Sequence, residues 1–212
     1  MRILVTGFEP FGGDTVNPSA MLAEALATET IAGVEIGHAI LPCSFAPLGA
    51  ALDAAMAAFR PDVVLCFGLA TGRTGITLER VAINVIDARI PDNLGAQPID
   101  EPVVAGGPAA YFSTLPIKAA CARTGEAGVP ASISQTAGTF ACNAVFYLAR
   151  HRTEETDIRA GFVHLPCLPE MPEARNGVPS LDFQQMRAAG RAIIQACLEC
   201  NTDRRIAGGA VA

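Results

Sequence analysis

Short apolar runs alternate with longer alanine-rich segments along this chain, and Gly or Pro residues separate one from the next. The short runs have the length of buried strands, whereas the longer segments repeat their apolar residues at helical spacing. Strands that alternate with helices of this length imply crossover connections and a mostly parallel, twisted sheet that is covered on both faces. The 212 residues therefore predict a single α/β domain.

The bounds of the individual elements follow from the same patterns. Asn17 is expected to cap the first helix, with Pro18 at its first position. Residues 76–90 are expected to be extended with one or two hairpin-like turns, and the domain is expected to cover residues 1–205, with residues 206–212 as a frayed tail. The other expected strands are residues 2–6, 34–41, 63–67, 131–134 and 158–165, and the expected helices are residues 18–27, 44–59, 115–123, 142–150 and 181–200.

Polar side chains collect where several predicted strands end. In open α/β sheets, ligand sites form at the carboxyl ends of the parallel strands. The loops that follow Thr6, Phe67, Ser134 and Val163 are therefore predicted to converge on one site.

The charge of the chain argues against nucleic acid and membrane partners. The formal net charge is −6 and the longest basic cluster is Arg204-Arg205, whereas nucleic-acid binding needs a basic face. The first residues reach Glu9 before a long apolar run forms, which is not typical of a signal peptide. The longest uncharged stretch, residues 127–149, contains Pro130 and Asn143, so a membrane helix is not expected there.

Seven cysteines, an odd number, are scattered through apolar segments, which favours reduced thiols in a cytoplasm over a disulfide framework. Cys197 and Cys200 form a C-x-x-C pair inside a predicted helix without a second pair, so a zinc or redox role for them is a minor alternative. Ordinary burial is the commoner fate of a free cysteine, and we assign it to Cys43, Cys66, Cys121 and Cys167.

Cys142 differs from these cysteines because it lies in the first turn of a predicted helix. The segment SQTAGTFACN reads as a strand end, a turn with glycine and then this helix. The positive end of the helix dipole and the free N–H groups there favour thiolate, the form that attacks carbonyl groups. The same N–H groups can receive an oxyanion. Cys142 is therefore the candidate nucleophile.

His164 is the best candidate for a base among only three histidines. It ends the strand GFVHLP, at the edge where α/β sites are built. His151 follows a helix end in a charged run and is expected to be a solvated cation, and His38 lies within a strand, where a structural role is expected.

Glu79 is the candidate to orient this base, since a thiol–imidazole pair needs a third group to fix the ring. In ITLERVAIN its side chain is in phase with Val81 and Ile83 and is predicted to point to an apolar side. A half-buried carboxylate requires a partner, and an imidazole N–H serves this need. A salt bridge to Arg73, Arg80 or Arg89 is the alternative.

Four blocks of this sequence occur together in one order. They are GFEPFGG with NPS, GR with ITLERVAIN and DARIPDNLGAQPIDEPV, SQTAGTFACN, and GFVHLPCLPE, and they extend from Gly7 to Glu170. Together they resemble the pyroglutamyl peptidase I family of cysteine peptidases, also called pyrrolidone-carboxylate peptidases. The resemblance implies an α/β/α sandwich, a cytoplasmic homotetramer and an activity without cofactor or metal, and peptides with N-terminal pyroglutamate as substrates.

The family's catalytic Cys, His and Glu fall on Cys142, His164 and Glu79, the three residues preferred above. The resemblance further implies that the flat lactam ring is bound by the aromatic residues Phe8, Phe11 and Phe140, with Asn17 as a polar contact. Where some members carry Gln, this chain has Leu69 in GLATGR, a side chain that donates no hydrogen bond.

The expected reaction is acyl transfer, in which the thiolate attacks the pyroglutamyl carbonyl and water hydrolyses the resulting thioester. Arg89 is a candidate to stabilise charge near the substrate, with a structural ion pair as the alternative. Two other function classes stay open: a phosphorylase-like enzyme that uses the glycine-rich loop 7–13, and a thiol-rich redox or metal-binding protein.

Overall fold

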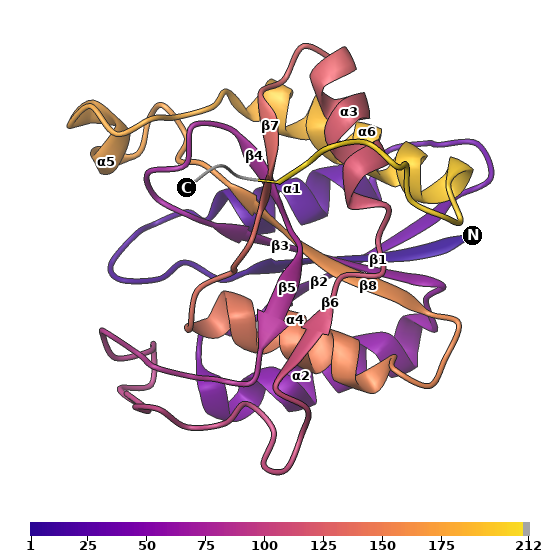
Figure 1. Ribbon diagram of the computed structural model, residues 1–212. Coiled ribbons are helices and arrows are strands. Elements are labelled where there is room, and N and C mark those ends of the chain that lie inside the picture. Colours follow the sequence, from indigo (N-terminus) through magenta and orange to yellow (C-terminus); the bar gives the residue numbers. More distant parts are fainter. Residues whose placement is uncertain (210–212) are drawn as a thin grey trace.

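A six-stranded sheet forms the middle layer of the computed structural model, which describes residues 1–209 (Figure 1). The strand order is β2-β1-β3-β8-β4-β7, and most neighbours are parallel. The predicted α/β fold with a mostly parallel sheet is therefore confirmed. The strands are β1 (Arg2–Phe8), β2 (Glu35–Leu41), β3 (Val63–Leu69), β4 (Ile76–Glu79), β7 (Ala131–Ser134) and β8 (Arg159–Leu165).

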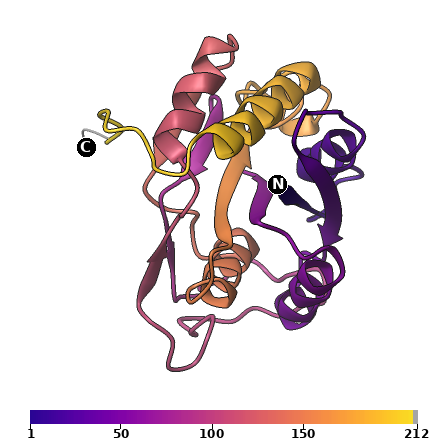
Figure 2. The ribbon, with the colours of Figure 1, turned by 90° about the vertical axis from the view of Figure 1, so that its right-hand side faces the viewer.

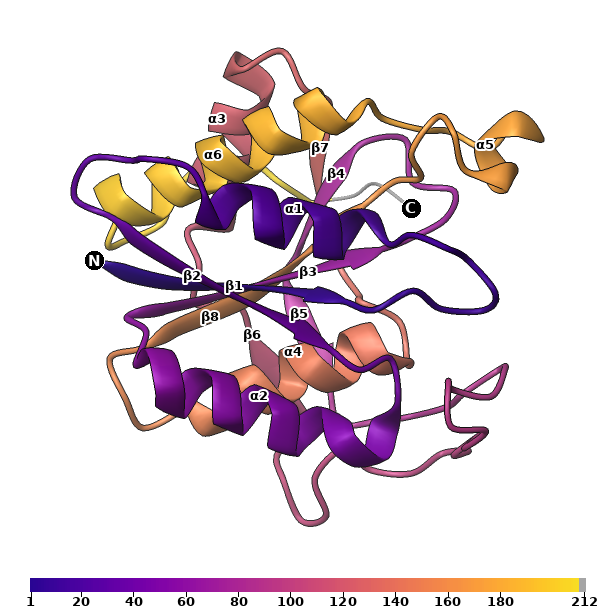
Figure 3. The same cartoon turned by 180° about the vertical axis from the view of Figure 1, so that it is seen from behind.

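Helices cover both faces of this sheet, as the views from the side and from behind show (Figures 2 and 3). In the central strand β3, Leu65 and Phe67 point to one helical layer and Val64 and Cys66 to the other, and all four are fully buried. This double burial explains why the strand is continuously apolar. One layer contains α1 (Pro18–Ala27), α3 (Ile117–Glu126) and α6 (Phe183–Glu199), and the other contains α2 (Phe45–Phe59) and α4 (Ala141–Arg152).

The direction of β4 was not predicted. It runs antiparallel to β8 and parallel to β7, so this pair of strands opposes the rest of the sheet. The extended segment 76–90 also divides after Glu79, because β5 (Val81–Ile83) leaves the main sheet and pairs with β6 (Ala110–Phe112). Neither β6 nor the short helix α5 (Pro172–Arg175) was expected, since neither has a periodic apolar pattern.

The first crossover brings the backbone of β1 very close to α1. Asn17 caps α1 as predicted, because its side chain accepts a hydrogen bond from the Ser19 N–H at 3.0 Å, and Pro18 follows at the first helical position. A Cβ atom on Gly7 would lie 2.3 Å from the carbonyl oxygen of Ser19. Only glycine permits this approach.

The C-terminal segment lies along the other edge of the sheet. The carbonyl oxygen of Gly208 accepts a hydrogen bond from the Arg80 guanidinium at 3.0 Å. Residues 210–212 lie outside the described part, and the fraying of residues 206–212 stays a prediction. Among residues 1–209, no helix has the length and apolar character needed to cross a bilayer.

We predict that Gly7→Ala lowers the free energy of unfolding by about 3 kcal/mol, because the new methyl group overlaps the α1 backbone, which cannot move aside. Urea unfolding followed by circular dichroism measures this loss. Gly125→Ala is the control: it has no neighbouring atom within 4 Å and is expected to stabilise the fold by about 0.4–1 kcal/mol. Equal stabilities of Gly7→Ala and wild type would contradict the close approach.

Candidate active site

A cavity of about 430 Å³ opens at the carboxyl ends of β1, β3 and β8. The predicted convergence of the loops after these strands is confirmed. The cavity is lined by Phe8, Phe11, Gly12, Asp14, Asn17, Cys43, Leu69, Thr71, residues 137–142, His164 and Glu173.

The loop after Ser134 reaches the cavity by a different route from the one expected. Because β7 opposes β8, its carboxyl end does not lie at the same edge of the sheet. Residues 137–141 then return to the cavity and lead into α4. The loop after Ser134 therefore reaches the site as predicted, although its strand runs opposite to β8.

Cys142 lies in the first turn of α4 and is partly exposed at the cavity wall. The next residue anchors this turn: the buried Asn143 amide accepts from the Ile83 N–H at 2.9 Å and donates to the carbonyl oxygens of Ile83 and Val85. Phe140, the residue before the helix, has no polar side chain to occupy the free N–H groups of the first turn. These N–H groups can therefore receive an oxyanion.

His164 lies on the same face of the sheet as the Cys142 sulfur. It pairs in register with Gly68 on β3, and a Cβ atom on Gly68 would lie 2.8 Å from the Cys142 Sγ. His164 is 4 % exposed and lines the same cavity. The structure therefore brings the predicted nucleophile and base together.

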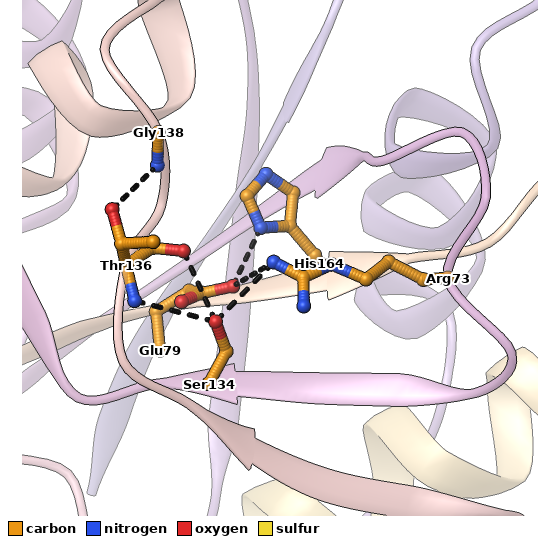
Figure 4. A network of polar contacts seen from close by, with 6 residues as sticks. All are labelled: Arg73, Glu79, Ser134, Thr136, Gly138 and His164. Atoms are coloured by element: carbon orange, nitrogen blue, oxygen red, sulfur yellow. Dashed lines mark hydrogen bonds and ion pairs between the residues drawn. The ribbon is translucent and has the colours of Figure 1, made fainter. Parts of the chain in front are cut away.

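The Glu79 carboxylate contacts the Nδ1 atom of the His164 imidazole. Its Oε1 lies 2.8 Å from the His164 Nδ1, and the carboxylate is fully buried (Figure 4). An ionised carboxylate only accepts hydrogen bonds, so with Glu79 in that state Nδ1 carries the proton and Nε2 keeps a free lone pair. The predicted burial of Glu79 agrees with the structure, and its neighbour Leu78 faces the opposite helical layer, as alternation along a strand requires. Val81 and Ile83 belong to β5 in the second sheet, so the phase with these residues does not continue along one strand.

The surroundings of the Cys142 thiol oppose the ionisation that a helix start favours. Burial raises the pKa of this thiol, and the Cys43 thiol and the Glu79 carboxylate act in the same direction. A base that takes the thiol proton therefore favours attack by this sulfur.

Aromatic rings form much of the apolar wall of the cavity. The Phe140 ring lies 5.3 Å from the Phe11 ring and 5.0 Å from the Phe45 ring, centroid to centroid. Phe8 also lines the cavity and is 3 % exposed. Such a wall suits a flat ring with few polar atoms.

Of the two other residues predicted to contact substrate, one lines the cavity and the other does not. Asn17 lines the cavity, but its Oδ1 accepts from Ser19 and its Nδ2 donates to the Glu9 carbonyl, so one amide N–H remains for a ligand. Arg89 is exposed and does not line the cavity. Its role toward substrate stays a prediction.

Gly68 and Asn143 were not identified from the sequence, although both shape the site. Asn143 carried a usable signal, because an amide inside the apolar run ACNAVFYLA must find hydrogen-bond partners once buried. Gly68 carried none, since its role depends on the packing of β3 against α4. In residues 1–209, no group of three or more His, Cys, Asp or Glu side chains is arranged to hold a metal ion.

Comparison with known proteins agrees with this geometry. Residues 1–200 match the family model of pyroglutamyl peptidases. The chain belongs to this family. Pyrrolidone-carboxylate peptidase from Chromobacterium violaceum is 53% identical over 99% of this chain and 98% of its own length. The protein of the same name from Escherichia fergusonii is 49% identical over 98% of each chain.

Solved structures of the pyroglutamyl peptidase family share the fold. Pyroglutamyl peptidase I from Bacillus amyloliquefaciens superposes with a TM-score of 0.94 at 39% identity, over 97% of this chain and 99% of its own. A mutant pyrrolidone carboxyl peptidase from Pyrococcus furiosus superposes with a TM-score of 0.88 at 40% identity, over 94% and 99%. The family and the fold that the sequence resemblance implied are both confirmed.

We predict that Gly68→Ala lowers kcat/KM for a pyroglutamyl amide about 100-fold, because its methyl group would lie 2.7 Å from the Phe162 ring and 2.8 Å from the Cys142 sulfur and would displace the sulfur. Gly49→Ala is the matched control, since its nearest atoms are 3.6 Å away, an ordinary contact. Thermal unfolding of both variants shows whether a loss of activity is caused by misfolding. Full activity of Gly68→Ala would contradict the tight packing of the sulfur against β3.

Proposed function

We propose that this protein is a cysteine exopeptidase that removes N-terminal pyroglutamyl (5-oxoprolyl) residues from peptides, with Cys142 as nucleophile, His164 as base and Glu79 as the orienting carboxylate. The observation that carries the proposal is the shared cavity, in which the thiol and the imidazole lie on one face of the sheet. Membership of the pyroglutamyl peptidase family supports the same substrate.

In the first step, His164 Nε2 takes the proton of the Cys142 thiol as the sulfur attacks the pyroglutamyl carbonyl carbon. The N–H groups of the first turn of α4 stabilise the oxyanion. The imidazolium then protonates the departing nitrogen, the C–N bond breaks, and a thioester remains. Glu79 stabilises the imidazolium through the 2.8 Å contact with Nδ1.

In the second step, His164 accepts a proton from water, which attacks the thioester carbonyl. The C–S bond breaks, the proton returns to the sulfur, and free pyroglutamate leaves. Both steps use only groups of this chain, so the proposed reaction needs neither a metal nor a cofactor.

The cavity explains why the substrate needs no terminal amine. A pyroglutamyl ring is flat and uncharged, with one N–H and one C=O. We assign the apolar faces of the ring to Phe8, Phe11 and Phe140, and a polar contact to the remaining N–H of Asn17. Leu69 also lines the cavity, so any hydrogen bond at this position comes from the backbone.

The proposal also covers the domain bounds, the cellular location and the oligomeric state. We assign the peptidase domain to residues 1–205, and we propose a cytoplasmic location and a homotetramer. The location is supported by seven cysteines of which none within residues 1–209 is in a disulfide, as a reducing compartment requires. The tetramer follows from the family resemblance, and light scattering tests it.

Cleavage of a chromogenic pyroglutamyl amide tests the proposed function. Wild type is expected to release the chromophore, and Cys142→Ala is expected to lose activity by about 10³-fold or more, since acyl transfer through sulfur is then impossible. Iodoacetamide is expected to label Cys142 and abolish cleavage. Cys66→Ala, which changes a fully buried cysteine on β3, is the control. Full cleavage by Cys142→Ala, or phosphate-dependent chemistry without amide cleavage, would refute the assignment.

Glu79→Gln tests the orienting carboxylate. The variant keeps the shape of the side chain but loses its charge, so we predict a folded protein in which kcat falls by about 10²- to 10⁴-fold. Steady-state kinetics and thermal unfolding of the same variant separate a loss of turnover from a loss of stability. If the variant fails to fold, Glu79 is chiefly structural.

A further inference from the structure

The buried Glu79 carboxylate has fewer partners than a buried charge requires. Its Oε1 contacts the His164 Nδ1, whereas Oε2 has no hydrogen-bond partner in residues 1–209. A neutral imidazole that donates through Nδ1 supplies a hydrogen bond but no countercharge. A carboxylate that is 0% exposed becomes protonated unless a positive charge lies nearby.

Arg73 supplies this charge from the loop between β3 and β4. Its Nη2 lies 3.6 Å from the Glu79 Oε1 and donates a 3.2 Å hydrogen bond to the Ser134 hydroxyl (Figure 4). The neighbouring Arg80 points elsewhere, because its guanidinium donates to the Gln135 side chain and the Gly208 carbonyl. Arg73 is the one Lys or Arg within 4.0 Å of Glu79 in the described chain.

Ser134 fixes the guanidinium at this place. Its hydroxyl accepts from Arg73 and donates to the Thr136 carbonyl at 3.0 Å, and the Thr136 hydroxyl accepts in turn from the Gly138 N–H. Gly138 lines the cavity. The arginine is therefore held by the same turn that forms part of the cavity wall, as Figure 4 shows.

The charge state of Glu79 decides which imidazole nitrogen is free. An ionised carboxylate requires the proton on Nδ1, which leaves Nε2 able to accept the thiol proton. A protonated Glu79 would instead donate to Nδ1, and the ring proton would move to Nε2. His164 could then take no proton from Cys142.

We propose that Arg73 is a positioning residue that keeps Glu79 ionised and thereby holds His164 in the tautomer with a free Nε2. The inference rests on the proposed function of Cys142, His164 and Glu79. Arg73 is 36% exposed at its side chain and touches neither the thiol nor the imidazole, so it acts through the carboxylate. Its effect is on turnover, and ring binding in the aromatic part of the cavity is not affected.

Arg73→Gln is expected to lower kcat about 10- to 100-fold with KM changed less than about 2-fold, because only the base is impaired. Arg73→Lys keeps the charge and is expected to recover most of the turnover. Arg80→Gln is the matched control, with kcat near wild type. The unfolding midpoint of Arg73→Gln should move by less than about 4 °C, because Glu79 then takes up a proton and does not remain a buried charge without a partner. Wild-type kcat in Arg73→Gln, or unfolding of both Arg73 variants, would overturn the proposal.

A double-mutant cycle tests whether Arg73 acts through Glu79. In the Glu79→Gln background there is no carboxylate to keep ionised, so adding Arg73→Gln should lower kcat by less than about 2-fold. A second loss as large as in the single variant would overturn the proposal.

The rate of Cys142 alkylation by iodoacetamide, followed by mass spectrometry, reports on the base without any peptidase substrate. It is expected to fall in Arg73→Gln and to be unchanged in Arg80→Gln. An unchanged rate in Arg73→Gln would overturn the proposal. If wild type cleaves no pyroglutamyl amide, the proposed function fails, and the alkylation rates still decide whether Arg73 supports the base.

Discussion

The contact between the Glu79 carboxylate and the His164 imidazole is the interaction on which the site depends. A charge without access to water is energetically costly. The buried Glu79 carboxylate lies where the antiparallel strands β4 and β8 meet in the sheet. The cost is offset only while an imidazole N–H and a guanidinium remain within reach. The surrounding fold can be understood as the framework that keeps these three groups together.

The reversal of β4 makes this arrangement possible. In a fully parallel sheet, the carboxyl end of β4 would lie beside the end of β8, and its last residue would face solvent or the cavity. Because β4 runs the other way, Glu79 lies one level below His164, beside Phe162 rather than at the rim. The carboxylate thus contacts the imidazole at Nδ1, from the side away from the rim of the cavity.

The sequence was a good guide to the elements and to the identity of the reactive side chains, for separate reasons. The capping of α1 by Asn17 and the burial of β3 depend on local pattern, so both could be predicted. Cys142 and His164 were chosen because one begins a helix and the other ends a strand. These positions can also be predicted from the local sequence pattern. The direction of β4 and the close packing at Gly68 depend on contacts between distant segments, and no local pattern encodes them.

The same distinction applies to electrostatics. From the sequence, a cysteine at a helix start is expected to ionise, since the helix dipole is a local property. The structure adds desolvation, which depends on every neighbour and raises the pKa of the Cys142 thiol. Likewise Arg73 was considered as a partner that would compete with His164 for Glu79, whereas the structure allows both contacts at once.

The raised pKa of the Cys142 thiol has a consequence for the reactivity of this sulfur between turnovers. Peroxide reacts with thiolates and hardly with thiols, so a higher thiol pKa lowers the rate at which oxidants attack the sulfur. The apolar walls that suit a lactam ring also exclude the water that would stabilise a standing anion. The burial that shapes the site thus also lowers the reactivity of the sulfur toward oxidants.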